Sequence, residues 1–220
     1  MPKKLITEWT IIEVSRRGEK VLLVDAETIV TAAAQDRARQ LGVRLENKTH
    51  EVISQPTVSS KTPDGPAKGQ QTVALGSDHG GFQLKEQLKP FMESLGYKVV
   101  DLGTYSEDAC DYPEFAYAVG RMVSLGDAVK GIMIDSVGSA SAIVANKLPG
   151  IRAVCCLNEF SARSSREHND ANVLTLGGRV LGIELAKSIV KVWLETLFGG
   201  GRHQKRVDKI SEIEKRFLKQ

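Results

Sequence analysis

The chain has 220 residues, of which 41% are hydrophobic and 26% are charged, and its formal net charge is +3. This composition is ordinary for a globular protein, and so small a charge gives no reason to expect a nucleic-acid partner. The sequence has no apolar run of about 18 residues, so we expect no transmembrane helix. The first ten residues lack the apolar core of a secretory signal, which favours a cytoplasmic protein with no membrane partner.

The cysteines form no ligand pattern. Cys110, Cys155 and Cys156 lie in or near apolar segments, and no CxxC or HxxxH pair occurs in the sequence. We interpret them as reduced thiols and expect no metal site. The stretch GSDHGG at 76–81 does not match GxGxxG, so we expect no dinucleotide cofactor either.

Residues 1–48 are predicted to form a small N-terminal α/β appendage. Thr31 is the expected N-cap of its main helix, and Gly42 is the expected glycine at the end of that helix. Because about 45 residues rarely support a core alone, we expect this unit to dock on the main domain or on a partner. The predicted elements are a helix over 7–17, a strand over 20–24 and a helix over 29–41.

Residues 49–70 are rich in Ser, Thr, Pro, Gly and Lys and are predicted to be a flexible linker. Residues 71–220 alternate strand and helix patterns, which predicts a doubly wound, Rossmann-like parallel sheet with helices on both faces. The last helix carries one apolar stripe, which is expected to pack on another subunit or, equally, on its own domain. The predicted strands are 72–75, 98–102, 131–134, 152–157 and 173–176, and the predicted helices are 82–95, 113–125, one ending near 147, 160–167, 183–198 and 204–218.

The segment 131–147 reads as a strand, a turn of small residues and a helix. A turn at a helix N-terminus presents backbone N–H groups that suit an anion or a developing oxyanion, and here that turn contains Gly138 and Ser139. Asp135 lies where the strand ends, beside the turn. The pattern alone leaves open whether Asp135 takes part in chemistry.

Other polar side chains also gather near the strand ends. Because ligands of doubly wound sheets bind at the carboxyl ends of the strands, we expect most of these residues to converge on one edge. Such a set suits proton transfer on a phosphorylated, polyhydroxylated substrate. The candidates are Asp78, His79, Tyr105, Asp135, Gly138, Ser139, His168, Asn169 and Arg179.

Each candidate also has a structural interpretation. Asp78 could cap the following helix, and His79 and His168 could be buried histidines that bond to the backbone. Arg202 and Arg206 lie one helical turn apart, which taken alone favours a solvated basic face.

Five stretches carry a family resemblance: GSDHGGFQLKEQL at 76–88, DLGTYSEDACDYPEFA at 101–116, ANKLPGIRA at 145–153, REHNDANVLTLGGRV at 166–180 and GGRHQKRVDKI at 200–210. On these motifs, residues 72–210 resemble the type B ribose-5-phosphate isomerases and the related galactose-6-phosphate isomerase subunits. The resemblance implies a cofactor-free aldose–ketose isomerase that works on a sugar phosphate through an enediolate. It also implies a homodimer or tetramer with sites shared between subunits.

The resemblance assigns a role to each candidate residue. Asp78 and His79 would face the substrate, Tyr105 would contact its hydroxyls, His168 would assist ring opening and Asn169 would bind a hydroxyl. Arg179 would approach the phosphate, and Arg202 and Arg206 would reach the phosphate in the neighbouring subunit's site.

The departure from the family lies at Asp135, where family members usually carry a cysteine base. Val137 replaces a frequent threonine, and Ser141 stands where some members have a glutamate base. An aspartate before such a turn resembles the A subunit of galactose-6-phosphate isomerase, which pairs with a cysteine-bearing B subunit. Three hypotheses follow: an isomerase with Asp135 as base, a degenerate subunit that completes a cysteine-bearing partner's site, and a sugar-phosphate-binding protein without turnover.

The N-terminal unit has a resemblance of its own. The order LIT, GEKVLLVD and IVTAAAQDRARQLG within 3–43 resembles a short module of enzymes packaged in bacterial microcompartments. It implies recruitment to a shell or to cargo partners, and the alternative is an inert extension.

Overall fold

The computed structural model describes residues 5–6, 10–11, 14–15, 19–24, 28–47 and 71–217. The chain divides into two compact units, Met1–Ala67 and Lys68–Gln220. The predicted linker over 49–70 lies outside the described residues. Within the described part of the chain, no helix is both long enough and apolar enough to span a bilayer.

The first unit contains two short parallel strand pairs and a helix, α2 (Ala32–Leu41). Thr31 caps α2 as predicted, because its Oγ1 accepts the Ala34 N–H at 3.1 Å, and Gly42 ends the helix at a φ of 66°. The predicted helix start at 29 is wrong, because Ile29 and Val30 pair with the first strand. Of the predicted helix over 7–17, the described residues 10–11 and 14–15 are helical. The strands are β1 (Leu5–Ile6), β2 (Val21–Val24), β3 (Ile29–Val30) and β4 (Arg44–Asn47), with β1 beside β3 and β2 beside β4.

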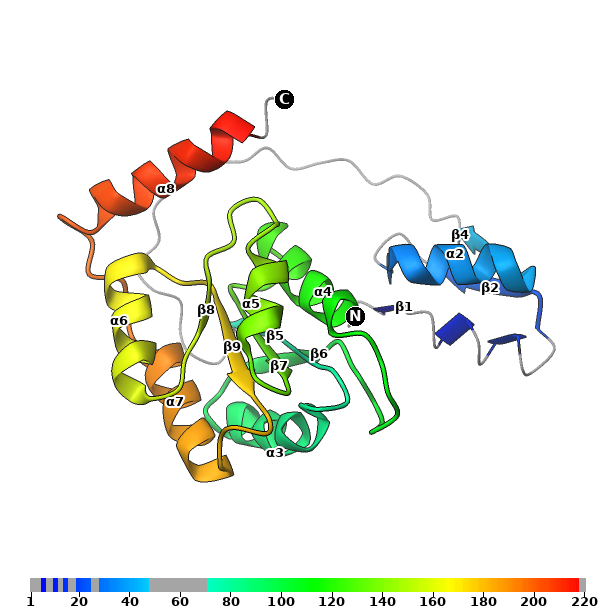
Figure 1. Cartoon of the computed structure of the whole chain (residues 1–220), viewed down its shortest axis with the longest axis horizontal. Helices are drawn as coiled ribbons and strands as arrows, with labels where there is room; N and C mark the ends of the chain where they lie inside the picture. Colours follow the sequence, from blue (N-terminus) through cyan, green and yellow to red (C-terminus); the bar gives the residue numbers. More distant parts are fainter. Residues whose placement is uncertain are drawn as a thin grey trace. The chain divides into compact units, whose positions relative to one another are not determined.

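The second unit is built on a five-stranded parallel sheet with the order β6-β5-β7-β9-β8, which confirms the predicted doubly wound fold (Figure 1). The chain leaves β5 for β6 on one side and then returns to β7 on the other, so the strand order reverses between β5 and β7. Ligands of such sheets bind at the carboxyl ends of the strands at this reversal. The strands are β5 (Thr72–Ser77), β6 (Lys98–Asp101), β7 (Lys130–Asp135), β8 (Ala153–Cys155) and β9 (Val173–Gly177).

Helices cover both faces of the sheet. On one face, α3 (Phe82–Ser94), α6 (Glu159–Asn169) and α7 (Ile183–Glu195) enclose the main apolar core. On the other face, α4 (Tyr112–Ser124) and α5 (Ser139–Ala145) pack side by side (Figure 1). The core residues include Leu75, Ile132, Ile134, Leu174, Leu88, Met92, Ile189 and Trp193.

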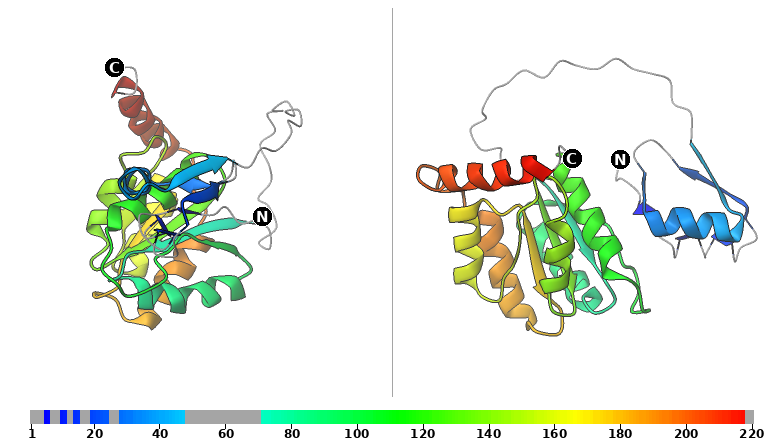
Figure 2. Two further views of the ribbon diagram at one scale, coloured as in Figure 1. Left: turned by 90° about the vertical axis from the view of Figure 1, so that its right-hand side faces the viewer. Right: turned by 45° about the horizontal axis from the view of Figure 1, so that its top comes forward.

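The last helix, α8 (Gln204–Phe217), runs along the amino-terminal edge of the sheet and touches α6 (Figure 2). Val207 is buried there, whereas Ile210, Ile213 and Phe217 are exposed. The predicted apolar stripe is therefore only partly covered by its own domain.

Candidate functional site

Asp78 directly follows β5 and Asp135 is the last residue of β7, the two strands that flank the reversal of strand order. Asp78 is 5% exposed, and its Oδ1 accepts the Gly81 N–H at 3.0 Å. It therefore holds the turn before α3, whose N-cap residue is Gly81 and not Asp78. Burial raises the pKa of Asp78; the Gly81 N–H and His79 act against this rise, and the nearby charge of Asp135 adds to it. The two carboxylates are therefore buried near each other at the carboxyl ends of β5 and β7.

Asp135 is 4% exposed, and both of its oxygens are engaged by the turn that follows it. Oδ1 accepts the N–H groups of Val137, at 2.7 Å, and of Gly138. Oδ2 accepts the N–H of Ser141 at 2.9 Å and its hydroxyl at 2.5 Å. Burial alone would raise the pKa of Asp135, but these hydrogen bonds, led by the Ser141 hydroxyl, outweigh burial and lower it.

The turn after Asp135 therefore already holds an anion, which is the carboxylate of its own chain. The Gly138 N–H, predicted to be available to a substrate oxyanion, is donated to Asp135. Gly138 has a φ of 94°, which explains its glycine, and a Cβ there would lie 2.7 Å from the Cys155 Sγ. Ser139 is the first residue of α5, and its substrate contact stays a prediction.

Three other candidates lie at the same edge. His79 Nδ1 lies 3.3 Å from both the N–H and the carbonyl oxygen of Cys110, so the ring contacts the backbone as the structural interpretation expected, but it is half-buried and not buried. Tyr105 is exposed, and its hydroxyl donates to the Asp101 carbonyl at 3.1 Å. Arg179 is exposed, and its N–H donates to the Ser136 carbonyl at 3.1 Å. Together with the two aspartates, these three residues form a set that we call the carboxyl-edge cluster. Its members are Asp78, His79, Tyr105, Asp135 and Arg179.

His168 and Asn169 do not join that cluster, so the prediction that they converge on one edge with it is wrong. They are the last two residues of α6, which leads into the start of β9, and so they lie at the amino-terminal edge of the sheet. Arg202 and Arg206 come from the segment that begins α8, beside the end of α6. We call these four residues, His168, Asn169, Arg202 and Arg206, the amino-edge cluster.

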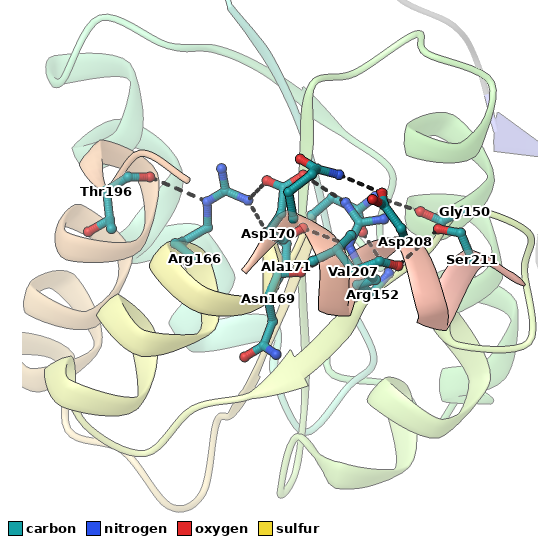
Figure 3. A network of polar contacts seen from close by, with 12 residues as sticks. Gly150, Arg152, Arg166, Asn169, Asp170, Ala171, Thr196, Val207, Asp208 and Ser211 are labelled. Carbon is teal, nitrogen blue, oxygen red and sulfur yellow. Dashed lines mark hydrogen bonds and ion pairs between the residues drawn. The ribbon is translucent and has the colours of Figure 1, made fainter. Parts of the chain in front are cut away.

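A polar network fixes the end of α6 (Figure 3). Asp170, with a φ of 47°, accepts hydrogen bonds from Arg166 at 2.8 Å and from Arg152 at 2.9 Å. Arg152 Nε also donates to the carbonyls of Asn169 and Asp170, whereas the Asn169 amide points away from the network. The network therefore holds the backbone of the amino-edge cluster and leaves the Asn169 side chain available.

Three residues that matter to these clusters were not singled out as candidates from the sequence. Ser141 holds Asp135, Asp170 anchors the end of α6, and the ring of His203 stacks on that of His168. The sequence signal that could have identified Ser141 is its hydroxyl group in the first turn of the helix after Asp135. Among the described residues, no group of three or more His, Cys, Asp or Glu side chains is placed to hold a metal ion.

Comparisons with known proteins connect this geometry to a family. The model of the family described as "Ribose/Galactose Isomerase" matches residues 73–210. The chain belongs to this family. Ribose-5-phosphate isomerase B of Escherichia coli K12 is 47% identical over 144 residues, which cover 66% of this chain and 97% of that protein. Galactose-6-phosphate isomerase subunit LacA of Streptococcus equi subsp. zooepidemicus is 40% identical over 141 residues, covering 64% and 98%. The structure of Clostridium thermocellum ribose-5-phosphate isomerase B matches with a TM-score of 0.66 and 49% identity, covering 67% of this chain and 99% of that one.

Proposed function

We propose that this chain is a sugar-phosphate aldose–ketose isomerase whose active site is assembled from two copies of the chain. The observation that carries the proposal is the separation of the two clusters: the carboxyl-edge cluster and the amino-edge cluster lie at opposite edges of one sheet. Each cluster alone lacks groups that isomerisation needs. Together they supply carboxylates, a histidine for ring opening and arginines for a phosphate.

Exposed apolar side chains beside both clusters support an assembly of two or four copies. Val137 and Ile143 are exposed next to Asp135, and Ile210, Ile213 and Phe217 are exposed on α8. A folded protein that leaves such groups in neighbouring positions has surface to bury against another copy. In the proposed twofold assembly, the amino edge of each copy faces the carboxyl edge of the other.

In the proposed reaction, Arg202 and Arg206 of one copy and Arg179 of the other bind the phosphate. The sugar ring opens when His168 donates a proton to the ring oxygen and Asp78 accepts the proton of the C1 hydroxyl, so that the bond between C1 and the ring oxygen breaks and the C1 carbonyl forms. Asp135 then moves the proton between C1 and C2, and Asp78 and His79 hold the hydroxyls. A carboxylate is a competent enolising base when it reaches both carbons. Asp135 does this only after one of its oxygens leaves the turn, because both are engaged here.

That engagement favours a second candidate function. Asp135 behaves in this structure as a fixed structural anion, which suits a subunit that lends its amino-edge cluster to a partner carrying the cysteine. LacA, a relative, is named as a subunit of its enzyme.

A turnover assay separates the two candidate functions. The purified full chain is expected to interconvert at least one pair among pentose and hexose phosphates, with ribose 5-phosphate and ribulose 5-phosphate as the first pair to test. Absence of turnover alone, with turnover restored by co-expression with a cysteine-bearing homologue, would establish the second function instead. Binding without turnover in either setting would reject both and leave a sugar-phosphate-binding protein.

For the N-terminal unit we propose recruitment to a bacterial microcompartment, in a cytoplasmic protein. The support is the sequence resemblance together with a small core of its own, which includes Ile6, Ile11, Val24 and Ala34. A unit with its own core can act as a tethered module, independent of the catalytic domain.

Deleting residues 1–67 is expected to leave the oligomer size unchanged and the kcat of the remaining domain within about twofold of the full chain, because each unit is compact by itself. Fusing residues 1–67 to a fluorescent protein is expected to direct it to microcompartments in a host that makes them. An insoluble deletion variant, or a diffuse fusion, would argue against recruitment.

A further inference from the structure

The rings of His168 and His203 form a stacked pair. Their centroids are 4.3 Å apart, and the angle between the ring planes is 9°. His168 is near the end of α6, and His203 lies in the turn before α8, so two separate elements meet at this contact. A parallel stack at this distance restricts the rotation of both rings.

His168 is also held from its own helix. The Ser164 hydroxyl, one turn earlier on α6, lies 3.2 Å from His168 Nδ1. This contact engages Nδ1 and leaves Nε2 as the nitrogen that can reach a substrate. The hydroxyl at the ring edge and the His203 ring on its face together define one orientation of the His168 imidazole.

The surroundings of His203 favour its neutral form. Arg202 Nε, which can only donate, lies 3.4 Å from His203 Nε2, and the enclosed Nδ1 has no hydrogen-bond partner among the described residues. Burial and the neighbouring His168, Arg202 and Arg206 lower the pKa of His203, and the charge of Glu167 acts in the other direction. A neutral aromatic ring tolerates positive charge on its face, so the stack is compatible with the proton donation that the proposed function assigns to His168.

His203 also connects His168 to the two arginines, through its own backbone. The His203 carbonyl accepts the N–H groups of Arg206 and Val207, both at 3.0 Å, at the start of α8. Arg202 precedes His203 directly in the sequence. A shift of the His203 backbone would therefore move its ring, which stacks on His168, together with the backbone of both arginines.

We propose that His203 is a positioning residue: its ring fixes the imidazole of His168 and ties it to the phosphate-binding Arg202 and Arg206 of the same chain. The proposal rests on the proposed function, in which His168 opens the sugar ring. It extends the amino-edge cluster by a residue that does not itself touch the substrate.

The first test needs no turnover. The full chain contains four histidines, so ¹⁵N-histidine labelling gives few signals to assign. We expect the His168 nitrogens of the wild type and of His203→Phe, which keeps a flat ring, to report one fixed tautomer. His203→Ala is expected to give averaged shifts of both tautomers, because without the stacked ring the His168 imidazole can rotate away from the Ser164 hydroxyl and carry its proton on either nitrogen. Lys205→Ala, an exposed neighbour, serves as the matched control and is expected to match the wild type.

The second test uses ribose 5-phosphate. His203→Ala is expected to lower kcat about 10-fold and to change KM less than about twofold, because misorientation of an acid weakens the chemical step more than binding. His203→Phe is expected to recover most of that loss. An unchanged tautomer in His203→Ala, or a Phe variant no better than Ala in the labelling experiment, would overturn the proposal. A wild type without turnover would count against the proposed function alone, since the labelling experiment still decides the role of His203.

Discussion

Replacing Asp135 with asparagine is expected to lower the isomerase kcat by about 100- to 10,000-fold, the usual contribution of a general base. Asparagine keeps the shape of the side chain but cannot accept the proton from the substrate carbon. KM is expected to change little, because the phosphate and hydroxyl contacts come from other residues. Steady-state kinetics with ribose 5-phosphate measure both quantities, and thermal unfolding checks that the variant is folded.

Ser141→Ala is the matched variant, because it leaves the carboxylate in place and removes one of its donors. The Ser141 hydroxyl is the strongest of the hydrogen bonds that lower the pKa of Asp135, so its loss raises that pKa. A base must be ionised to act, and activity falls as the pH drops through its pKa. The acid limb of the pH–kcat profile is therefore expected to move to higher pH in Ser141→Ala.

The two variants together decide the assignment of the base. If Asp135→Asn keeps its kcat, Asp135 is not the base. If Asp135→Asn is inactive but the acid limb of Ser141→Ala stays in place, Asp135 supports the turn and another group moves the proton. Asp78 would be the first residue to examine in that case, since it is buried beside Asp135 and its pKa is raised.

The sequence predicted the sheet because each buried strand is an apolar run bounded by glycine or polar residues, as in β7 and β9. It missed β1, β3 and β4, which have two, two and four residues and give little periodic signal. The error at His168 and Asn169 has a geometric cause. Residues after a strand lie at its carboxyl end, but α6 runs back across the sheet and carries its last residues to the opposite edge.

Other parts of the site depend on distances that no local pattern contains. The sequence shows that an aspartate lies beside an anion-binding turn. It does not show whether the turn binds a ligand or that aspartate. Ser141 decides this through a hydroxyl contact of 2.5 Å. His203 was not predicted as a site residue because its role depends on stacking against His168, which lies 35 positions earlier in the chain.

Mixed dimers of two inactive variants are expected to regain about half of the wild-type kcat. One parent is Asp78→Asn, which changes the carboxyl-edge cluster and keeps its Oδ1 as an acceptor for Gly81. The other carries Arg202→Ala and Arg206→Ala, two exposed residues of the amino-edge cluster. In a twofold assembly that builds each site from both copies, the mixed dimer has one site with every residue intact and one site with both defects.

Co-expression with two different affinity tags, followed by tandem purification, isolates the mixed dimers for assay. Each parent alone is expected to lose at least about 100-fold in kcat/KM, because Asp78→Asn removes a charged substrate contact and the arginine variant removes the phosphate clamp. A control pair with both changes in the amino-edge cluster, Asn169→Ala with the double arginine variant, is expected to be no more active than its Asn169→Ala parent, since neither of its sites is complete. Mixed dimers no more active than their parents would place each site within a single copy, although the two clusters lie at opposite edges of its sheet.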